Sequence, residues 1–475
     1  MISTIQPIYM RLFKNYRAGI VLLCLVFHIT TAQDRDYHPG KNPDRIILSW
    51  EVDPATSRTI TWWTDTTILQ AQVQWLISDA SSDLPAKATS THGHTVKATA
   101  GGKTAHFHSA HLVDLDPNTV YAYRVGVESY WSEWFQFKTI DRQALGFNFL
   151  YLGDAQNDMR SLWARTIRQA YTQHPQASFV LHLGDMVDHA DNPGEWGEWF
   201  EAGGWIMASV PQVLVAGNHE YVRDPSSLDG TRLSEYWRHT FTLPLNGPPG
   251  LGETAYYFDY KNVRFIVLDS RDMLISEDHS QRQADWLEKL LANNPQQWTV
   301  VSHHHPIYSS RGNRKGYSIA EYLQPLYDQY KVDLVLQGHH HSFARGRAFE
   351  EVGQAEHQGP VYYVSNSGPK MYDTNFAGWI ERTAINVQLY HNVEVAGDRL
   401  TVETYLVNGT LYDQIELRKK PNGSKLFREI QLEGMEERLD FPRATYGADI
   451  DTSQEYKSTF KKRALEYLKK RGLRE

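Results

Sequence analysis

The sequence predicts a layered α/β domain that follows a smaller, all-β domain. Between residues 147 and about 419, short apolar runs rich in Val, Leu and Phe alternate with helical stretches, the order expected of a layered α/β domain. Residues 42–140 show instead the apolar–polar alternation of half-buried strands, for example at 59–63 and 71–75. The 475 residues, of which 41% are hydrophobic, suffice for two or three domains with a large core.

The first 32 residues have the pattern of a secretory signal peptide. Basic residues at positions 11, 14 and 17 precede an apolar segment at 18–29 and the small residues at 30–32. A membrane span needs roughly 20 apolar residues and this segment has about 12, so we expect cleavage rather than stable membrane insertion. We therefore expect a secreted or periplasmic protein, with Met10 as an alternative start because the region before the apolar segment is unusually long.

Cysteine usage and charge exclude several classes of function. The only cysteine, Cys24, lies in the leader, so the cleaved chain would have no disulfide, no thiolate ligand and no cysteine nucleophile. Leu23 stands where a bacterial lipoprotein signal prefers a small residue, which makes a lipid anchor a minor alternative. The 48 Lys and Arg against 56 Asp and Glu give a net charge of −8, and removal of the leader's three basic residues brings it to −11. This acidic balance argues against a nucleic-acid-binding surface.

The all-β region contains a turn with a characteristic tyrosine. Residues 115–121, which end in Tyr121, and the alternating residues 123–125 resemble the tyrosine corner of a fibronectin type III sandwich. We expect the Trp and Tyr residues of this region to pack in the sandwich core, with a carbohydrate-binding platform as the alternative. Residues 141–146 are the expected linker to the next domain.

Five segments of the α/β region each end an apolar run with a metal-binding side chain. The runs are 147–152, 179–183, 213–216, 298–302 and 334–337, and the segments after them are Gly153-Asp154, Gly184-Asp185, Gly217-Asn218-His219-Glu220, His303-His304-His305-Pro306 and Gly338-His339-His340-His341. Ligands at the carboxyl ends of such strands converge on one crevice. Asp, Asn and His offer oxygen and imidazole nitrogen, which favours Zn, Fe or Mn in a hydrolytic site. A sixth run, 361–365, ends at Asn366 without an obvious ligand.

The order of these segments resembles the calcineurin-like metallophosphoesterases and, within them, the purple acid phosphatase family. A single Gly-Asp or Gly-Asn pair is common in turns, whereas five segments in this order are highly specific. The resemblance implies an α/β (α+β) fold, a four-layer metallophosphoesterase sandwich over 147–419. Residues 42–140 are similar to the N-terminal, fibronectin type III-like domain of plant-type members.

Residues 427–475 are expected to form a charged, partly helical C-terminal tail, with a helix over 460–470. Its basic clusters at 461–463 and 469–471 are expected on a solvated helix face, with an anionic surface as the alternative partner.

The resemblance also implies two metal ions per chain, Fe, Zn or Mn. It makes Asp185 the bridging ligand, with Asp154 and His341 completing the first metal and Asn218, His304 and His339 the second. His219 would be the substrate-facing histidine, placed to hydrogen-bond the phosphate or to protonate the leaving alkoxide.

Two positions depart from the purple acid phosphatase pattern. The family has Gly two residues after its first Asp and a metal-bound Tyr three residues after its bridging Asp, where this chain has Gln156 and Asp188. The first metal would therefore lack the phenolate that stabilises ferric iron and gives the purple colour, and Asp188, Gln156 or a water are candidates to replace it. The paired histidines of some plant members are also absent. Arg311 and Arg314 in that segment are candidate phosphate-binding residues, with a solvent-facing basic loop as the alternative.

The predicted function is hydrolysis of phosphate monoesters on a phosphorylated small molecule by attack of a metal-bound hydroxide. The nearest alternative is a phosphodiesterase, because the same bimetal site serves both and only the pocket walls decide. A non-catalytic phosphate- or glycan-binding protein is the alternative from another class, although the six retained ligands favour an enzyme. We predict no nucleic-acid partner, no stable membrane insertion and no particular oligomeric state.

Overall fold

The computed structural model describes residues 37–312, 316–432 and 434–473. The predicted signal peptide, Cys24 and Arg314 lie outside these residues. From His38 onward the chain forms one compact unit. Within the described ranges, no helix is both long enough and apolar enough to cross a bilayer.

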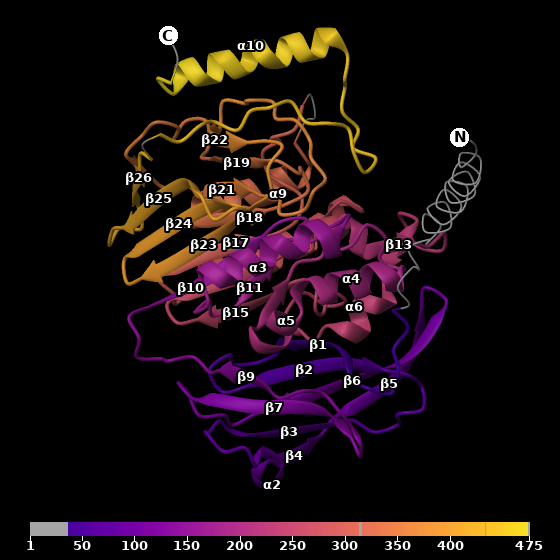
Figure 1. Cartoon of the computed structure of the whole chain (residues 1–475). Helices are drawn as coiled ribbons and strands as arrows, with labels where there is room; N and C mark the ends of the chain where they lie inside the picture. The colour runs from indigo at the N-terminus through magenta and orange to yellow at the C-terminus, as the bar shows by residue number, and fades with distance from the viewer. Residues whose placement is uncertain (1–36, 313–315, 433, 474–475) are drawn as a thin grey trace, which may run out of the picture. The chain divides into compact units, whose positions relative to one another are not determined.

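The N-terminal region is a sandwich of two antiparallel sheets, as predicted (Figure 1). One sheet has the order β1 (Asp44–Ser49), β2 (Arg58–Thr64), β6 (Lys103–Leu112) and β5 (His94–Ala100). The other has the order β4 (Thr89–His92), β3 (Gln72–Ile77), β7 (Val120–Val127) and β8 (Tyr130–Trp131). Strand β9 (Phe135–Lys138) pairs with β7 on the same edge as β8, and the short helix α2 (Leu84–Lys87) lies between β3 and β4 in the chain. The predicted tyrosine corner is present, because the hydroxyl of Tyr121 accepts a hydrogen bond of 2.9 Å from the backbone N–H of Asp116.

Strand β2 is buried on both faces, which corrects the prediction of a half-buried strand. Trp62 lies in the core between the two sheets of the sandwich. Trp63 points the other way and stacks on Tyr236 of helix α6 (Glu235–Thr240), with ring centroids 5.1 Å apart. The hydroxyl of Tyr236 in turn donates to the carbonyl of Ala100 at 2.8 Å. The aromatic residues of β2 therefore serve packing on both sides.

The α/β region is built on two mixed sheets. The first has the order β12 (Gln212–Leu214), β11 (Val180–His182), β10 (Gly146–Leu152), β23 (Leu389–Ala396), β24 (Arg399–Leu406), β25 (Leu411–Lys419), β26 (Lys425–Glu429) and β20 (Glu356–His357). The second has the order β15 (Tyr256–Tyr260), β16 (Val263–Val267), β17 (Trp298–Ser302), β18 (Leu334–Gln337), β21 (Val361–Val364), β19 (Phe343–Gly346) and β22 (Ile380–Ala384). A hairpin of β13 (Tyr221–Arg223) and β14 (Thr231–Leu233) follows β12.

Helices cover the outer faces of both sheets, which confirms the predicted four layers. The helical segments are η1 (Met159–Trp163), α3 (Ala164–Gln173), α4 (Pro193–Gly203), α5 (Trp205–Ser209), η2 (Asn218–Glu220), α7 (Ser270–Met273), α8 (Glu277–Ala292) and α9 (Ile319–Gln329). Between the sheets, Phe149 of β10 meets Phe265 of β16 edge to face, with centroids 5.2 Å apart. On the far side of the second sheet, Ile266 and Val301 share a core with α8 and α9. Figure 1 shows α3 lying across β10 and β23, which it contacts.

After β26 the chain continues as a C-terminal tail, defined here as residues 430–473 without residue 433. It ends in helix α10 (Gln454–Lys470), which begins six residues before the predicted helix because the side chain of Ser453 caps it and accepts from the N–H of Tyr456 at 3.2 Å. Phe460 and Tyr467 of α10 are buried against Phe376, with centroids 5.2 and 5.5 Å away. The tail is therefore docked. Lys461 and Lys462 face solvent as predicted, whereas Arg471 of the second basic cluster does not, because its side chain is 15% exposed and its Nη2 lies 2.7 Å from Glu429 Oε1.

Candidate metal centre

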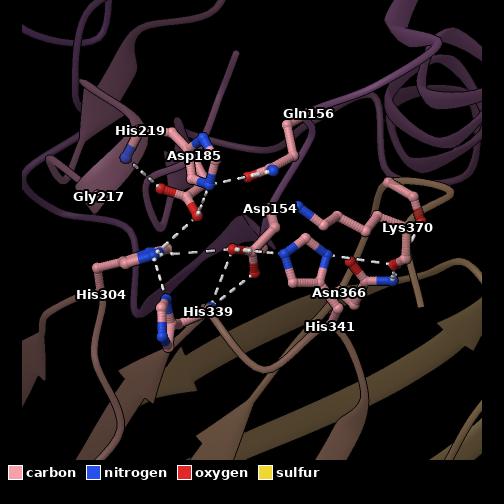
Figure 2. A network of polar contacts seen from close by, with 12 residues as sticks. Asp154, Gln156, Asp185, Gly217, His219, His304, His339, His341, Asn366 and Lys370 are labelled. Atoms are coloured by element: carbon pink, nitrogen blue, oxygen red, sulfur yellow. Dashed lines mark hydrogen bonds and ion pairs between the residues drawn. The ribbon is translucent and has the colours of Figure 1, made fainter. Parts of the chain in front are cut away.

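The predicted ligands lie in loops that follow parallel strands of the two sheets. Figure 2 shows the side chains of Asp154, Asp185, His304, His339 and His341 close to one another. Strands β10, β11 and β12 run parallel in the first sheet, and β16, β17, β18 and β21 do so in the second. The loops after β10, β11, β12, β17 and β18 carry the ligand candidates. Because neighbouring parallel strands end at the same edge, the loops of each sheet meet there, and the two sheets together supply one centre.

Two groups of candidate ligands form, and Asp185 belongs to both. One group contains Asp185, His304 and His339, the other Asp154, Asp185 and His341, and within each group the ligand atoms lie within 4.8 Å of one another. His304 Nε2 is 3.1 Å from Asp185 Oδ2 and 3.2 Å from His339 Nδ1. His341 Nε2 is 3.9 Å from Asp154 Oδ1. A carboxylate shared by two groups is what a bridge between two cations requires.

In each of the three candidate ligand histidines, one ring nitrogen contacts another group of the protein. This contact orients the other ring nitrogen toward the centre. His304 Nδ1 donates to the carbonyl of Leu183 at 2.7 Å, and His341 Nδ1 donates to that of Lys370 at 3.2 Å. His339 Nε2 lies 2.5 Å from the hydroxyl of Tyr317. Metal-binding histidines are commonly held in this way.

Asn218 supplies an acceptor that needs a partner. Its Oδ1 is buried, and no hydrogen bond to it is found in the described part of the chain. Buried polar atoms are almost always satisfied, so a cation at this place would supply what the protein does not. Carboxylate oxygen, amide oxygen and imidazole nitrogen together fit hard or borderline ions, so the residues present fit a pair of metals.

The electrostatics of the buried acids also favour cations. Burial raises the pKa of Asp154 to about 7, an effect that His304 opposes and Asp185 strengthens. Burial acts in the same direction on Asp185, but His304 and His219 lower its pKa below the ordinary value. Asp185 in turn raises the pKa of His304 to about 10 against the effect of burial. Two carboxylates crowded in a buried place are relieved by positive charge.

Backbone geometry brings the loops this close. Asp185, His339 and His341 have left-handed φ angles of 51°, 72° and 44°, a conformation that is uncommon outside glycine and concentrates at functional sites. Gly217 packs so tightly against Asp185 that a Cβ there would lie 2.2 Å from Asp185 Oδ1. The glycine of this segment is therefore required by close approach.

Glu220 holds together the loops that carry Asp185 and Gly217, a role that the sequence did not reveal. Its Oε2 accepts from the N–H groups of Asp185 and Gly217 at 2.9 and 2.7 Å, and its Oε1 accepts from that of Met186 at 2.9 Å. Burial and the charge of Asp185 raise its pKa to about 7, while the backbone donors oppose this shift. The only signal in the sequence is its place two residues after the ligand candidate Asn218.

His219 stands beside the ligand groups without belonging to either. Its backbone N–H donates to Asp185 Oδ1 at 3.0 Å, and its Nδ1 donates to the carbonyl of Asp188 at 2.6 Å. The other ring nitrogen, Nε2, is 3.9 Å from Asp185 Oδ2. A histidine oriented in this way presents one ring nitrogen to whatever binds next to Asp185.

Gln156 and Asp188, the two departures from the family pattern, contact each other. Gln156 Nε2 donates to Asp188 Oδ1 at 2.8 Å and lies 3.4 Å from His219 Nε2. Gln156 is fully buried, and its Oε1 has no hydrogen-bond partner among the described residues. Both side chains thus lie next to His219, and their roles as metal ligands stay predictions.

Arg311 is engaged by the C-terminal tail. It is 5% exposed, its guanidinium lies 3.4 Å from the ring centroid of Tyr372, and it donates to the carbonyl of Asp449 at 2.6 Å. Tyr372 packs on His341, with centroids 5.1 Å apart. Arg311 therefore supports the wall of the centre through Tyr372, and phosphate binding by Arg311 stays a prediction.

The sixth strand of the sequence pattern also reaches the centre. After β21, Asn366 Nδ2 donates to the carbonyls of Gly368 and Lys370 at 3.1 and 3.0 Å, which holds the loop beside His341. The loop brings the side chain of Lys370 to the ligand group. The sequence gives no signal for this lysine, because it lies six residues beyond the end of β21 and in none of the recognised segments.

Comparison with known proteins finds two family models that match the chain. A family model described as the N-terminal domain of purple acid phosphatases matches residues 43–139, and one described as calcineurin-like phosphoesterase matches residues 147–343. The chain is similar to acid phosphatase type 7 from Homo sapiens, with 27% identity over 370 residues that cover 72% of this chain and 80% of that protein.

Two further similarities bear on activity and fold. A protein of Arabidopsis thaliana named "Probable inactive purple acid phosphatase 1" is 25% identical over 346 residues, 63% of this chain and 54% of the relative. A solved purple acid phosphatase, PPD1 from yellow lupin (Lupinus luteus) seeds, matches with a TM-score of 0.69 and 19% identity, covering 81% of this chain and 75% of that one. The chain is a calcineurin-like metallophosphoesterase of the purple acid phosphatase type, with a purple acid phosphatase N-terminal domain ahead of the phosphoesterase domain.

Proposed function

We propose that this protein is a secreted phosphatase that hydrolyses phosphate monoesters with the help of two bound metal ions. The observation that carries the proposal is that Asp185 belongs to both groups of candidate ligands. The unsatisfied Oδ1 of Asn218 and the similarity to a protein named as an acid phosphatase support it. Secretion rests on the signal-peptide pattern of the first 32 residues.

The chain's own residues have separate tasks in this reaction. Asp154, Asp185, Asn218 and the three histidines would hold the ions, which when bound supply Lewis acidity and a water of lowered pKa as nucleophile. His219 Nε2, beside Asp185, is placed to hydrogen-bond the phosphoryl group or to pass a proton to the leaving oxygen. Glu220 keeps the loops of Asp185 and Gly217 together while the substrate binds.

A relative with a name that marks it as inactive makes a non-catalytic phosphate-binding protein the second candidate. Asp188, which stands where the family has a metal-bound tyrosine, is the residue that would explain a loss of catalytic activity. Both candidates predict phosphate binding, but only the first predicts turnover.

Reconstitution with Fe, Zn or Mn tests the proposal. We expect elemental analysis to give about two metals per chain, and the loaded protein to hydrolyse a p-nitrophenyl phosphate monoester faster than the corresponding diester. Faster diester hydrolysis would favour a phosphodiesterase. Two bound metals without turnover of either ester would favour the non-catalytic candidate, and one metal or none would contradict the dinuclear centre.

Replacement of the bridge gives the matched variant. Asp185→Asn keeps the size of the side chain but removes the charge that holds two cations together. We expect a loss of more than about 100-fold in turnover, because even outer residues of metal sites cost 10–100-fold. Asp278→Asn, at an exposed position of α8, is the control and should behave as wild type. Near-normal turnover with both metals in Asp185→Asn would mean that Asp185 is not the bridge.

A further inference from the structure

Lys370 is a buried cation at the edge of the metal centre. The residue is 7% exposed, and Figure 2 shows its side chain running past His341 toward the ligand group. Two hydrogen bonds fix its backbone, since its carbonyl accepts from Asn366 Nδ2 at 3.0 Å and from His341 Nδ1 at 3.2 Å.

Among the described residues, one carboxylate lies within ion-pair distance of the Lys370 ammonium. Its nearest carboxylate is Asp188, with 3.8 Å between Nζ and Oδ1, which is beyond hydrogen-bond distance. Asp188 Oδ1 already accepts from Gln156 at 2.8 Å. Within the residues that the structure describes, no hydrogen bond from the ammonium is found. Lysines are seldom buried unless paired, so a further anion is expected at this place.

The neighbours of Lys370 indicate where that anion binds. Asp188 is contacted by Gln156, and Lys370 Nζ and His219 Nδ1 lie 3.8 and 3.5 Å from its Oδ1, so Lys370 and His219 share Asp188 as a neighbour. Two bound cations would make this region more positive still, which favours the binding of a further anion beside Lys370. The substrate phosphate is the anion that the proposed reaction brings to this side of the centre.

We propose that Lys370 binds a phosphoryl oxygen of the substrate and makes the site selective for dianionic phosphate monoesters over monoanionic diesters. This inference rests on the proposed function and names a specificity-determining residue for it. A phosphate monoester carries close to two negative charges near neutral pH, whereas a diester has lost one charged oxygen to its second ester group. A lysine acts on phosphate as a point charge, so its contribution grows with the charge of the ligand.

The test uses the full, metal-loaded protein and three variants. Lys370→Met keeps the length of the side chain and removes the charge, Lys370→Arg keeps the charge, and Lys97→Met, at an exposed position of β5, is the matched control. Catalytic efficiency is measured with p-nitrophenyl phosphate and with bis(p-nitrophenyl) phosphate. Binding of inorganic phosphate is measured by titration calorimetry, and metal content by elemental analysis.

We expect Lys370→Met to lower the efficiency on the monoester, and the affinity for inorganic phosphate, by about 10- to 100-fold, with a much smaller effect on the diester and no loss of metal. Lys370→Arg should keep most of the preference for the monoester, and Lys97→Met should match wild type. Equal losses on both esters, unchanged phosphate affinity, or loss of metal in Lys370→Met would overturn the proposal.

The phosphate titration separates this inference from the proposed function. If the wild type hydrolyses neither ester, the proposed function fails, and the affinity for inorganic phosphate alone decides the role of Lys370. Weaker binding by Lys370→Met, but not by Lys370→Arg, would still support a phosphate-binding lysine. Equal binding by all variants would refute it.

Discussion

His219 presents one defined ring nitrogen to the centre. Nδ1 donates to the carbonyl of Asp188 at 2.6 Å, which leaves Nε2 on the side of Asp185. The side chain is 27% exposed, whereas Asp185 beside it is 1% exposed. A partly exposed histidine next to a buried ligand group can reach a substrate without holding a metal, which suits a proton-transfer role.

Removal of this ring separates catalysis from metal binding. We expect His219→Ala to lower turnover by about 100- to 10,000-fold, the usual range for a general acid, with the metal content unchanged. Elemental analysis beside steady-state kinetics checks this. His239→Ala, outside the centre on α6, is the control histidine. If His219→Ala loses metal in proportion to activity, His219 is a ligand.

Asp188 has a consequence for colour. The resemblance attributes the purple colour of the family to charge transfer from a phenolate to ferric iron, and a carboxylate offers no such transition. We expect the iron-loaded protein to be colourless or pale, and Asp188→Tyr to gain a visible band if residue 188 reaches the first metal. Absorption spectra of the two proteins measure this. An intense band in the wild type would show that another tyrosine binds the iron.

The sequence predicted the ligand candidates but not the residues that support them. Asp154, Asp185 and the histidines of the two triplets stand in short segments with fixed spacing, and such spacing is visible in a sequence. Glu220 and Lys370 depend on contacts across 35 residues to Asp185 and across 182 residues to Asp188, which only the fold creates. The partners of Arg311 are hidden for the same reason, since Asp449 lies 138 residues away.

At the scale of elements, the C-terminal tail ties together loops that carry the centre. The hydroxyl of Tyr446 donates to Asp158 in the loop after β10, and that of Tyr456 donates to Asp373 in the loop after β21. The carbonyl of Asp449 accepts from Arg311 in the loop after β17. One segment thus contacts three loops at the same edge of the two sheets.

Phe460 is the residue on which the docking of α10 depends most. It is 3% exposed and packs on Phe376 and Phe441 at 5.2 and 5.1 Å. A buried Phe→Ala change costs about 3–5 kcal/mol, more than a peripheral helix is expected to gain by docking, so we expect Phe460→Ala to release the helix.

Limited trypsin digestion with mass spectrometry measures this release at Lys461, Lys462 and Arg463. Leu465→Ala, on the same helix but at a 40% exposed position, should stay as resistant as wild type. Equal resistance of both variants would show that Phe460 does not hold the helix.

The bounds of strands predicted from the sequence agree best with the structure where every residue of the strand is buried. Strands β17 and β18 have the predicted bounds, because both are covered on two faces and their apolar runs are continuous. The hairpin of β24 and β25 turns at Asn408 and Gly409, an Asn-Gly pair typical of such turns, and Gly409 has a φ of 85°. Strand β2 was predicted less well, since its second buried face is created by α6 and not by its own alternation.

At the scale of the whole molecule, neutral buried histidines make stability depend on pH. Burial lowers the pKa of His108 and His182 to about 4 and that of His391 to about 3. His391 lies between strands, hydrogen-bonded to Thr404 and Ser365 at 2.9 and 2.7 Å. In the unfolded chain a histidine has a pKa of about 6.5, so between this pH and about 4 the unfolded state binds more protons. The contribution of these three histidines to stability is therefore full above pH 6.5 and falls as the pH decreases toward 4.

His391→Gln tests the largest of these contributions. We expect the loss of unfolding free energy between pH 7 and pH 4.5 to be smaller in this variant by roughly 3 kcal/mol, since glutamine does not take up a proton. Urea unfolding at the two pH values measures the difference. His94→Gln, at an exposed position of β5, should keep the pH dependence of the wild type. An unchanged dependence in His391→Gln would mean that His391 is not neutral in the folded protein.

The position of the tail sets an order of events during biosynthesis. Residues 446–456 leave the ribosome after every loop that carries a ligand candidate, and they contact the loops after β10, β17 and β21. A nascent chain that has emerged to the end of β26 already contains every strand of both sheets and every candidate ligand. The tail residues that contact this edge have not yet emerged. The contacts of residues 446–456 with these three loops are therefore the last that can form at the edge that carries the candidate ligands.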